Sequence, residues 1–338
     1  MDNHSYQTTD YHTAGEPFRI VTSGVPEIPG RNVPDRREYA RDHADVDAVR
    51  RLLCHEPRGH ADMYGCFLVP PDDDGADFGA LFWHKDGYST ACGHGTIALG
   101  TWAVESGRVP AHPDGLTEVT IDVPSGRVLA RVRCHEGLVR SVTFRNVPSY
   151  VLARAVPVPT SRGTAYVDVA YGGAIYGCVP AAEFGLTVDP VHYPELIAIG
   201  REVKRELDTT GIVAHPSDSR LSGVYGVVLF DDLGDLPTGP HQRNVTVFAD
   251  GQVDRSPCGS GTSARLALLA EEGRLDTDRV LRHDSIVDTT FVARVVARVR
   301  AEGRDAIVSE VEGSAFRTGE HRFVLDPRDP LGAGFVLR

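Results

Sequence analysis

The sequence has no stretch that is apolar for long enough to span a membrane. Its first seven residues show no basic segment followed by an apolar run, so no secretion signal is evident. Basic residues are fewer than acidic ones, 35 against 47, and the net charge of −12 argues against nucleic acid or an anionic membrane as the main partner. We therefore expect a cytoplasmic protein whose partner is a small molecule.

Cysteine is also scarce, with six among 338 residues, which is too few for a disulfide framework. The triplets at 54–56 and 134–136 both read Cys-His-Glu, but there is no Cys-x-x-Cys pair, and a closed metal site requires four converging ligands. The chain also lacks a Gly-Lys-Ser/Thr phosphate loop and a complete dinucleotide fingerprint. We expect neither a metal nor a cofactor.

Two of the cysteines open the same short motif, once in each half of the chain. Residues 91–98 read Ala-Cys-Gly-His-Gly-Thr-Ile-Ala, and residues 257–264 read Pro-Cys-Gly-Ser-Gly-Thr-Ser-Ala. A Glu, a Gly and an Arg follow each cysteine at the same distances: Glu105, Gly107 and Arg108 in the first copy, Glu271, Gly273 and Arg274 in the second. The repeat predicts two similar halves, each bringing one cysteine to a shared place.

Each motif is typical of a turn that runs into an apolar helix ended by a glycine. Apolar periodicity predicts further helices at residues 32–53 and 195–207. Alternating or continuous apolar runs predict strands at residues 18–21, directly after residue 65, and at 79–83, 116–147, 164–169, 174–179, 224–230, 244–248, 291–299, 306–311 and 322–325. A helix that is apolar on most sides is usually central, so we expect each half to be a curled sheet around its helix.

The predicted fold is therefore α/β, with two pseudo-symmetric domains, each a curled, mostly antiparallel sheet around a central helix. We place the first domain, which carries Cys92, at residues 1–150, with the C-terminal strand at 320–338 returning to it. The second domain, which carries Cys258, covers residues 151–319, and we expect the active site between the two.

The chemistry follows from cysteines at helix N-termini. The positive end of the helix lowers the pKa of a thiol, and the free N–H groups bind carboxylates. With an amino acid held by its carboxylate, the thiolate of one cysteine takes the α-proton while the other returns one from the opposite face, which inverts the centre without a cofactor. Asp254 is the candidate for the substrate ammonium, or it caps a turn. His94 contacts the carboxylate or orients the site, or it is a packing residue.

These motifs, together with Asp-Tyr-His-Thr-Ala-Gly-Glu-Pro at 10–17, resemble the signatures of the proline racemase superfamily. The resemblance covers nearly the whole chain. It implies domains like those of diaminopimelate epimerase, a cofactor-independent mechanism and a homodimer. It also implies that Cys92 and Cys258 are the catalytic pair. In the family the positions of Gly93, His94, Gly259 and Ser260 bind the carboxylate, and the position of Asp254 contacts the ring nitrogen.

Within that superfamily, the residues at 56–60, 87–90, 170–174 and 244–250 resemble most the trans-3-hydroxy-L-proline dehydratases, which typically carry threonine at the position of Cys258. Inversion requires a proton donor on the far face, whereas dehydration requires one base and help for the departing hydroxyl. We therefore expect an isomerase, a two-base racemase or 2-epimerase of proline or of 3- or 4-hydroxyproline. The alternative is a hydro-lyase, trans-3-hydroxy-L-proline dehydratase, and a third interpretation is a non-catalytic binding protein for proline-like ligands.

Overall fold

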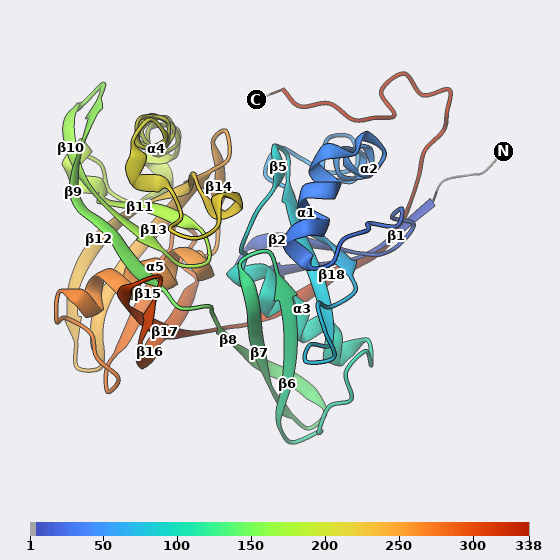
Figure 1. Cartoon of the computed structure of the whole chain (residues 1–338), viewed down its shortest axis with the longest axis horizontal. Coiled ribbons are helices and arrows are strands. Elements are labelled where there is room, and N and C mark those ends of the chain that lie inside the picture. The colour runs from blue at the N-terminus through green and yellow to red at the C-terminus, as the bar shows by residue number, and fades with distance from the viewer. Residues whose placement is uncertain (1–4, 338) are drawn as a thin grey trace. The chain divides into compact units, whose positions relative to one another are not determined.

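A computed structural model describes residues 5–337 (Figure 1). The fold is mixed α/β with a large mixed sheet. The chain forms two compact units: the first holds the residues up to Thr90, Gly95–Val142 and those from Ser314 on, and the second holds Ala91–His94 and Thr143–Gly313. Within residues 5–337, no helix has both the length and the apolar character needed to cross a membrane.

The first unit is built from strands with two helices between the second and the third. The strands are β1 (Ser5–Thr13), β2 (Glu16–Ser23), β3 (Tyr64–Val69), β4 (Phe78–His84), β5 (Gly87–Tyr88), β6 (Gly115–Val123), β7 (Gly126–His135) and β18 (Ala315–Val324). The helices are α1 (Val33–Asp42), α2 (Ala44–Cys54) and α3 (Gly93–Glu105), of which α3 has its first two residues in the second unit. β8 (Leu138–Arg145) runs from the first unit into the second.

The second unit has the same kinds of element. Its strands are β9 (Tyr150–Thr160), β10 (Gly163–Tyr171), β11 (Ile175–Pro180), β12 (Val224–Leu236), β13 (Gly239–Phe248), β14 (Gln252–Asp254), β15 (Val280–Ser285), β16 (Thr290–Ala301) and β17 (Arg304–Gly313). Its helices are α4 (Tyr193–Asp208) and α5 (Gly259–Glu271), with short 3₁₀ turns at Ala181–Phe184, Pro190–His192, Gly211–Val213 and Ser219–Leu221.

The two units repeat one order of strand pairing. In the first, β2 and β3 are parallel, β3 and β4 antiparallel, and β4 pairs with β5 before α3 leads to β6, which is parallel to β4. In the second, β11 and β12 are parallel, β12 and β13 antiparallel, and β13 pairs with β14 before α5 leads to β15, which is parallel to β13. Each cysteine motif therefore lies at the same step of the same topology.

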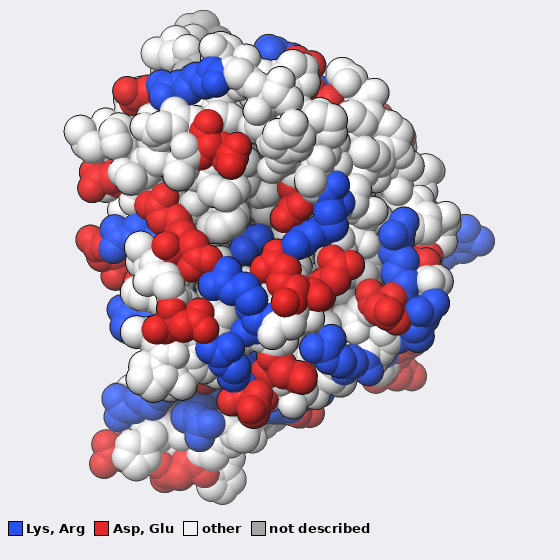
Figure 2. Space-filling model, turned by 90° about the vertical axis from the view of Figure 1, so that its left-hand side faces the viewer, with Lys and Arg blue, Asp and Glu red and all other residues white. Residues whose placement is uncertain are grey.

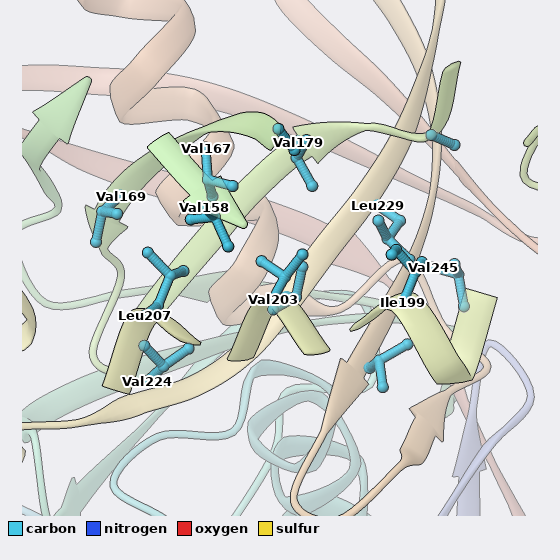
Figure 3. Close-up of a cluster of buried hydrophobic side chains, with 14 of the residues drawn as sticks. Val158, Val167, Val169, Val179, Ile199, Val203, Leu207, Val224, Leu229 and Val245 are labelled. Carbon is cyan, nitrogen blue, oxygen red and sulfur yellow. The ribbon is translucent and has the colours of Figure 1, made fainter. Parts of the chain in front are cut away.

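Alternation along β11 and β12 gives the second unit two apolar faces. Ile175 and Val179 of β11 belong to a cluster with the buried face of α4, which includes Ile199, Val203 and Leu207 (Figure 3). The residues between them, Tyr176 and Cys178, belong instead to a cluster with Cys258 and with Ala264 and Leu268 of α5. Because successive side chains of a strand point to opposite faces, these strands carry α4 on one side and the α5 helix start on the other.

Most of the predicted elements are confirmed, with differences at one helix and at several strands. The predicted helix at 32–53 is two helices, α1 and α2, which meet at His43. The segment before residue 18 forms strand β1, which was not predicted, and β5, β9, β14 and β15 also lie outside the predicted strands.

Charged side chains of both signs are interleaved over the face of the molecule shown in Figure 2. Ion pairs are frequent in the second unit, for example Arg154 with Glu272 and Arg201 with Asp250, both at 2.6 Å. The face drawn in Figure 2 mixes the two signs and shows no broad basic surface.

Candidate active site

The second cysteine motif begins with a chain of hydrogen bonds that starts at Asp254. The backbone N–H and the hydroxyl of Ser256 donate to Oδ1 of Asp254 at 2.8 and 2.7 Å. The backbone N–H of Cys258 donates to Oγ of Ser256 at 3.1 Å. All three residues are buried. The loop before α5 is thus held by its own side chains, and the Asp254 carboxylate is the acceptor at which these hydrogen bonds begin.

Cys258 is the N-cap of α5 and has φ 61° and ψ 100°. For a residue with a Cβ this left-handed region costs about 1–3 kcal/mol, and such strain persists only where the surroundings enforce it. The thiol contacts β11: its S–H donates to the hydroxyl of Tyr176 at 3.9 Å, and that hydroxyl lies 2.6 Å from Oγ of Ser260. An unusual backbone conformation therefore aims the sulfur at a polar group on the face of β11 that meets α5.

The protonation of Cys258 differs from the sequence-based expectation. Burial, followed by the nearby Asp254 carboxylate, raises the pKa of the Cys258 thiol well above its ordinary value. The N–H of Gly261 and the hydroxyls of Thr246 and Tyr176 act in the opposite direction, and their effect is smaller. The helix N-terminus does favour the thiolate, as we expected, but desolvation outweighs it. Burial therefore favours the neutral form of the Cys258 thiol.

The first motif contributes Cys92, which is 4% exposed and belongs with His94 to the second unit. Both ring nitrogens of His94 lie 3.5 Å from Sγ of Cys92, and Nδ1 lies 3.6 Å from Oδ2 of Asp254. Burial opposes ionisation of Asp254, but His94 and the hydrogen bonds from Ser256 outweigh it and hold the pKa of the carboxyl below its usual value. The Asp254 carboxylate, the His94 imidazole and the Cys92 thiol therefore lie next to one another in space, in that order.

The two motifs meet at their first glycines. A Cβ added to Gly93 would lie 2.5 Å from Cα of Gly259, and one added to Gly259 would lie 2.7 Å from Cα of Gly93. Both distances are far below a normal contact, so the two helix starts touch backbone to backbone and leave no room for a side chain. The sequence-predicted residues Cys92, Gly93, His94, Asp254, Cys258, Gly259 and Ser260 all lie within the second unit around this contact.

Tyr176 and Ser256 contact these residues, and the sequence analysis did not single them out. Alternation in β11 is the signal that separates Tyr176 from Ile175 and Val179, because it assigns Tyr176 to the opposite face. Ser256 lies two residues from both Asp254 and Cys258, which is the spacing of a local side-chain turn.

The Cys-His-Glu triplets have structural contacts, and in the second triplet Nδ1 of His135 lies 2.9 Å from Oδ1 of Asp114. Cys54 donates to the carbonyl of Met63 at 3.4 Å, and Nε2 of His55 lies 3.1 Å from the carbonyl of Lys85. Over residues 5–337, no group of three or more His, Cys, Asp or Glu side chains could hold a metal ion.

Comparison with known proteins supports the resemblance seen in the sequence. Residues 8–336 match the family model described as "Proline racemase". The chain belongs to the proline racemase family. It is 44% identical over 337 residues to trans-3-hydroxy-L-proline dehydratase of Bacillus thuringiensis subsp. konkukian, with 98% of both chains covered. It is also 44% identical over 338 residues to 3-hydroxyproline 2-epimerase of Burkholderia multivorans, covering 99% of this chain and 98% of that one.

A solved member of this family has the same fold. The crystal structure of a hydroxyproline epimerase from Agrobacterium vitis, with bound trans-4-OH-L-proline, matches with a TM-score of 0.91 and 32% identity. The match covers 99% of this chain and 96% of that one. The protein is therefore a member of a family that contains both epimerases and dehydratases.

The raised pKa of Cys258 predicts slow alkylation at neutral pH. Because only the thiolate reacts, we expect the rate of modification by iodoacetamide to rise about tenfold per pH unit from pH 7 to pH 9. Peptide mass spectrometry of Cys258 measures this rate. Burial is the main cause of the raised pKa and the Asp254 carboxylate adds to it, so Cys258 in an Asp254→Asn variant should react faster at each pH. A rate that is already constant from pH 7 upward would contradict the prediction.

Proposed function

We propose that this protein is a cofactor-independent 2-epimerase that acts on a hydroxyproline. The observation that supports it best is the backbone contact of Gly93 with Gly259, because it brings together two helix starts that each carry a cysteine. One cysteine removes the proton from C2 and the other returns a proton to the opposite face. A hydroxyproline is favoured over proline because the curated relatives and the solved relative described above are named for hydroxyproline.

The remaining residues hold the substrate. Asp254, ionised and buried, pairs with the ring ammonium in place of His94. The N–H groups at the two helix starts, from Gly93, His94, Gly259 and Ser260, bind the carboxylate and stabilise the negative charge that develops on it as the C2 proton leaves.

The two cysteines have different starting states in this proposal. Cys258 is the acid, because its pKa is raised and its thiol is neutral. Cys92 is the base in this scheme, with the imidazole of His94 beside it at 3.5 Å from its sulfur. The named dehydratase relatives act on an L-substrate, and the resemblance implies that such enzymes carry threonine at the position of Cys258. We therefore assign Cys92 to the C2 proton of the L-isomer and Cys258 to that of the D-isomer.

We further propose that the two units are pseudo-symmetric domains, each a curled sheet around its helix as in diaminopimelate epimerase, and that the protein acts as a homodimer. The repeated order of strand pairing supports the first part of this proposal. Size-exclusion chromatography with light scattering tests the second.

The second candidate is trans-3-hydroxy-L-proline dehydratase. Several of the relatives at 40–44% identity carry this name, and one carries the epimerase name, so the relatives favour this alternative over our main interpretation from the sequence. In the trans isomer the 3-hydroxyl and the C2 proton lie on the same face of the ring. One base on that face then suffices, and the thiol of Cys258 has no necessary role.

Proton NMR in deuterated water distinguishes these activities. The purified protein is incubated, without added cofactor, with L-proline, trans-4-hydroxy-L-proline or trans-3-hydroxy-L-proline. We expect deuterium at C2 together with the opposite configuration for a hydroxyproline. A cyclic imine from the 3-hydroxy compound alone would establish the dehydratase instead. No change in any of the three substrates would indicate a binding protein.

A further inference from the structure

We propose that Asn244, Thr262 and His283 are positioning residues that hold the peptide group between Pro257 and Cys258 and thereby aim the Cys258 thiol. The inference rests on the proposed function, because it assigns Cys258 a proton-transfer role. None of the three residues belongs to the cysteine, glycine and aspartate set described above. Asn244 lies in β13, Thr262 in the first turn of α5, and His283 in β15.

The three side chains form one connected group around the Pro257 carbonyl. That oxygen accepts from Nδ2 of Asn244 and from the hydroxyl of Thr262, each at 3.0 Å. His283 bridges the two donors: Nε2 lies 2.8 Å from Nδ2 of Asn244, and Nδ1 lies 2.8 Å from Oγ1 of Thr262. All three side chains are 0% exposed. Oδ1 of Asn244 has no hydrogen-bond partner among the described residues, whereas the other polar side-chain atoms of the group are all paired. Because a buried network is costly unless its groups are paired, the order of these hydrogen bonds is tightly determined.

The Pro257 carbonyl fixes the direction of every hydrogen bond in the group. Only the amide nitrogen of Asn244 can face that carbonyl, because two acceptors would repel each other. The same nitrogen faces His283, so Nε2 must be the acceptor and Nδ1 must carry the proton. That N–H donates to Thr262, whose hydroxyl hydrogen is then left for the carbonyl. The imidazole is thus present as one neutral tautomer.

The charge state of His283 agrees with this order. Burial, reinforced by Arg265, lowers the pKa of His283 to about 3. Nearby Asp284 raises it and His241 lowers it, and neither reverses the direction. The group therefore keeps the same hydrogen bonds throughout the neutral pH range.

The restrained peptide group is the one that sets the conformation of Cys258. Its carbonyl is held by Asn244 and Thr262, and its N–H donates to Oγ of Ser256 at 3.1 Å. On the other side, the carbonyl of Cys258 accepts from the backbone N–H of Thr262 at 2.7 Å. With both neighbouring peptide groups fixed, Cys258 is kept at φ 61°. Release of this restraint would allow the residue to relax and would move the sulfur.

Thr262→Val and Thr262→Ser form a matched pair for the test. Valine keeps the shape but removes the hydroxyl, whereas serine keeps the hydroxyl. We expect inversion by the valine variant to fall about 10–100-fold, since a misplacement near 1 Å has an effect of that order. Exchange of the C2 proton of the D-isomer, which requires Cys258, should fall equally. Exchange from the L-isomer, which requires Cys92, should change less than about threefold, and the serine variant should stay near wild type.

Two outcomes would overturn the proposal. Equal losses of exchange from both isomers would indicate a general structural defect, and equal behaviour of the valine and serine variants would remove the role of the hydroxyl.

A measurement that does not depend on turnover separates this inference from the proposed function. Long-range ¹H–¹⁵N spectra of the wild-type protein should show His283 protonated at Nδ1 and unchanged from pH 5 to pH 9. Protonation at Nε2, or titration within that range, would refute the hydrogen-bond order even if the enzyme proves to be a dehydratase.

Discussion

Replacement of Cys258 by serine should lower the rate of inversion at C2 by at least about 10³-fold, because an alcohol at this position is a far weaker acid and base than a thiol and general acid–base catalysis is worth factors of this size. Serine is only slightly smaller and retains a hydrogen-bond donor toward Tyr176, so the helix start should fold unchanged. The measurement is the circular dichroism or chiral chromatography of the product with each hydroxyproline as substrate.

The matched control is Cys178→Ala. Cys178 lies in the same buried cluster as Cys258, and burial likewise raises the pKa of its thiol, to about 12, but it lies outside the repeated motif. The Cys178→Ala variant should therefore invert its substrate at close to the wild-type rate. Inversion at near-normal rate in Cys258→Ser would show that the two-base scheme is wrong.

Cys258→Thr addresses the dehydratase alternative. If this variant forms a cyclic imine from trans-3-hydroxy-L-proline, the base on the other face suffices for elimination.

Asp254→Asn should lower kcat/KM by about 10²–10³-fold, with most of the change in KM, because it leaves a substrate ammonium buried without its counter-charge. Asparagine retains an oxygen that can accept both hydrogen bonds from Ser256, so the loop before α5 keeps its geometry. Steady-state kinetics at saturating and limiting substrate separate the two parameters.

Asp250→Asn is the control for the loss of one negative charge. Asp250 is in the turn between β13 and β14, its side chain is 61% exposed, and it pairs with Arg201 at the surface. Exposed ion pairs contribute little, so this variant should behave as wild type. A KM for Asp254→Asn within about threefold of wild type would show that another group binds the substrate nitrogen.

The sequence predicted the cysteine motifs as helix starts because their information is local. Glycines, a threonine and an apolar run lie within a few residues of each cysteine, and α3 and α5 begin at Gly93 and Gly259 as these signals indicate. The boundary between α1 and α2 at His43 was missed because neither a glycine nor a proline marks it.

Strand β1 was missed for a different reason. Its inward positions include Thr8 and Asp10, which are buried although they are polar. The carboxylate of Asp10 pairs with Arg19 of β2 at 2.7 Å, so the partner that makes burial possible lies on another strand. A hydrophobic pattern cannot reveal a strand whose buried side chains are polar.

The protonation of Cys258 and the role of His283 depend on residues that are distant in sequence. The helix dipole is a local property and was anticipated, whereas desolvation of Cys258 results from packing against β11 and other strands. His283 lies 25 residues beyond Cys258 in a strand with no motif of its own, and its importance becomes visible only when β15 pairs beside β13.

The pairing of β1 with β18 has a consequence for the order in which a newly synthesised chain folds. Ser5 is opposite Val324, so the first unit cannot complete its sheet until almost the whole chain has left the ribosome. Every residue of the second unit, in contrast, has been made by Gly313. Domains generally fold during synthesis from the N-terminal end. Here the second unit should become native first, while one edge of β1 stays unpaired until β18 has been synthesised.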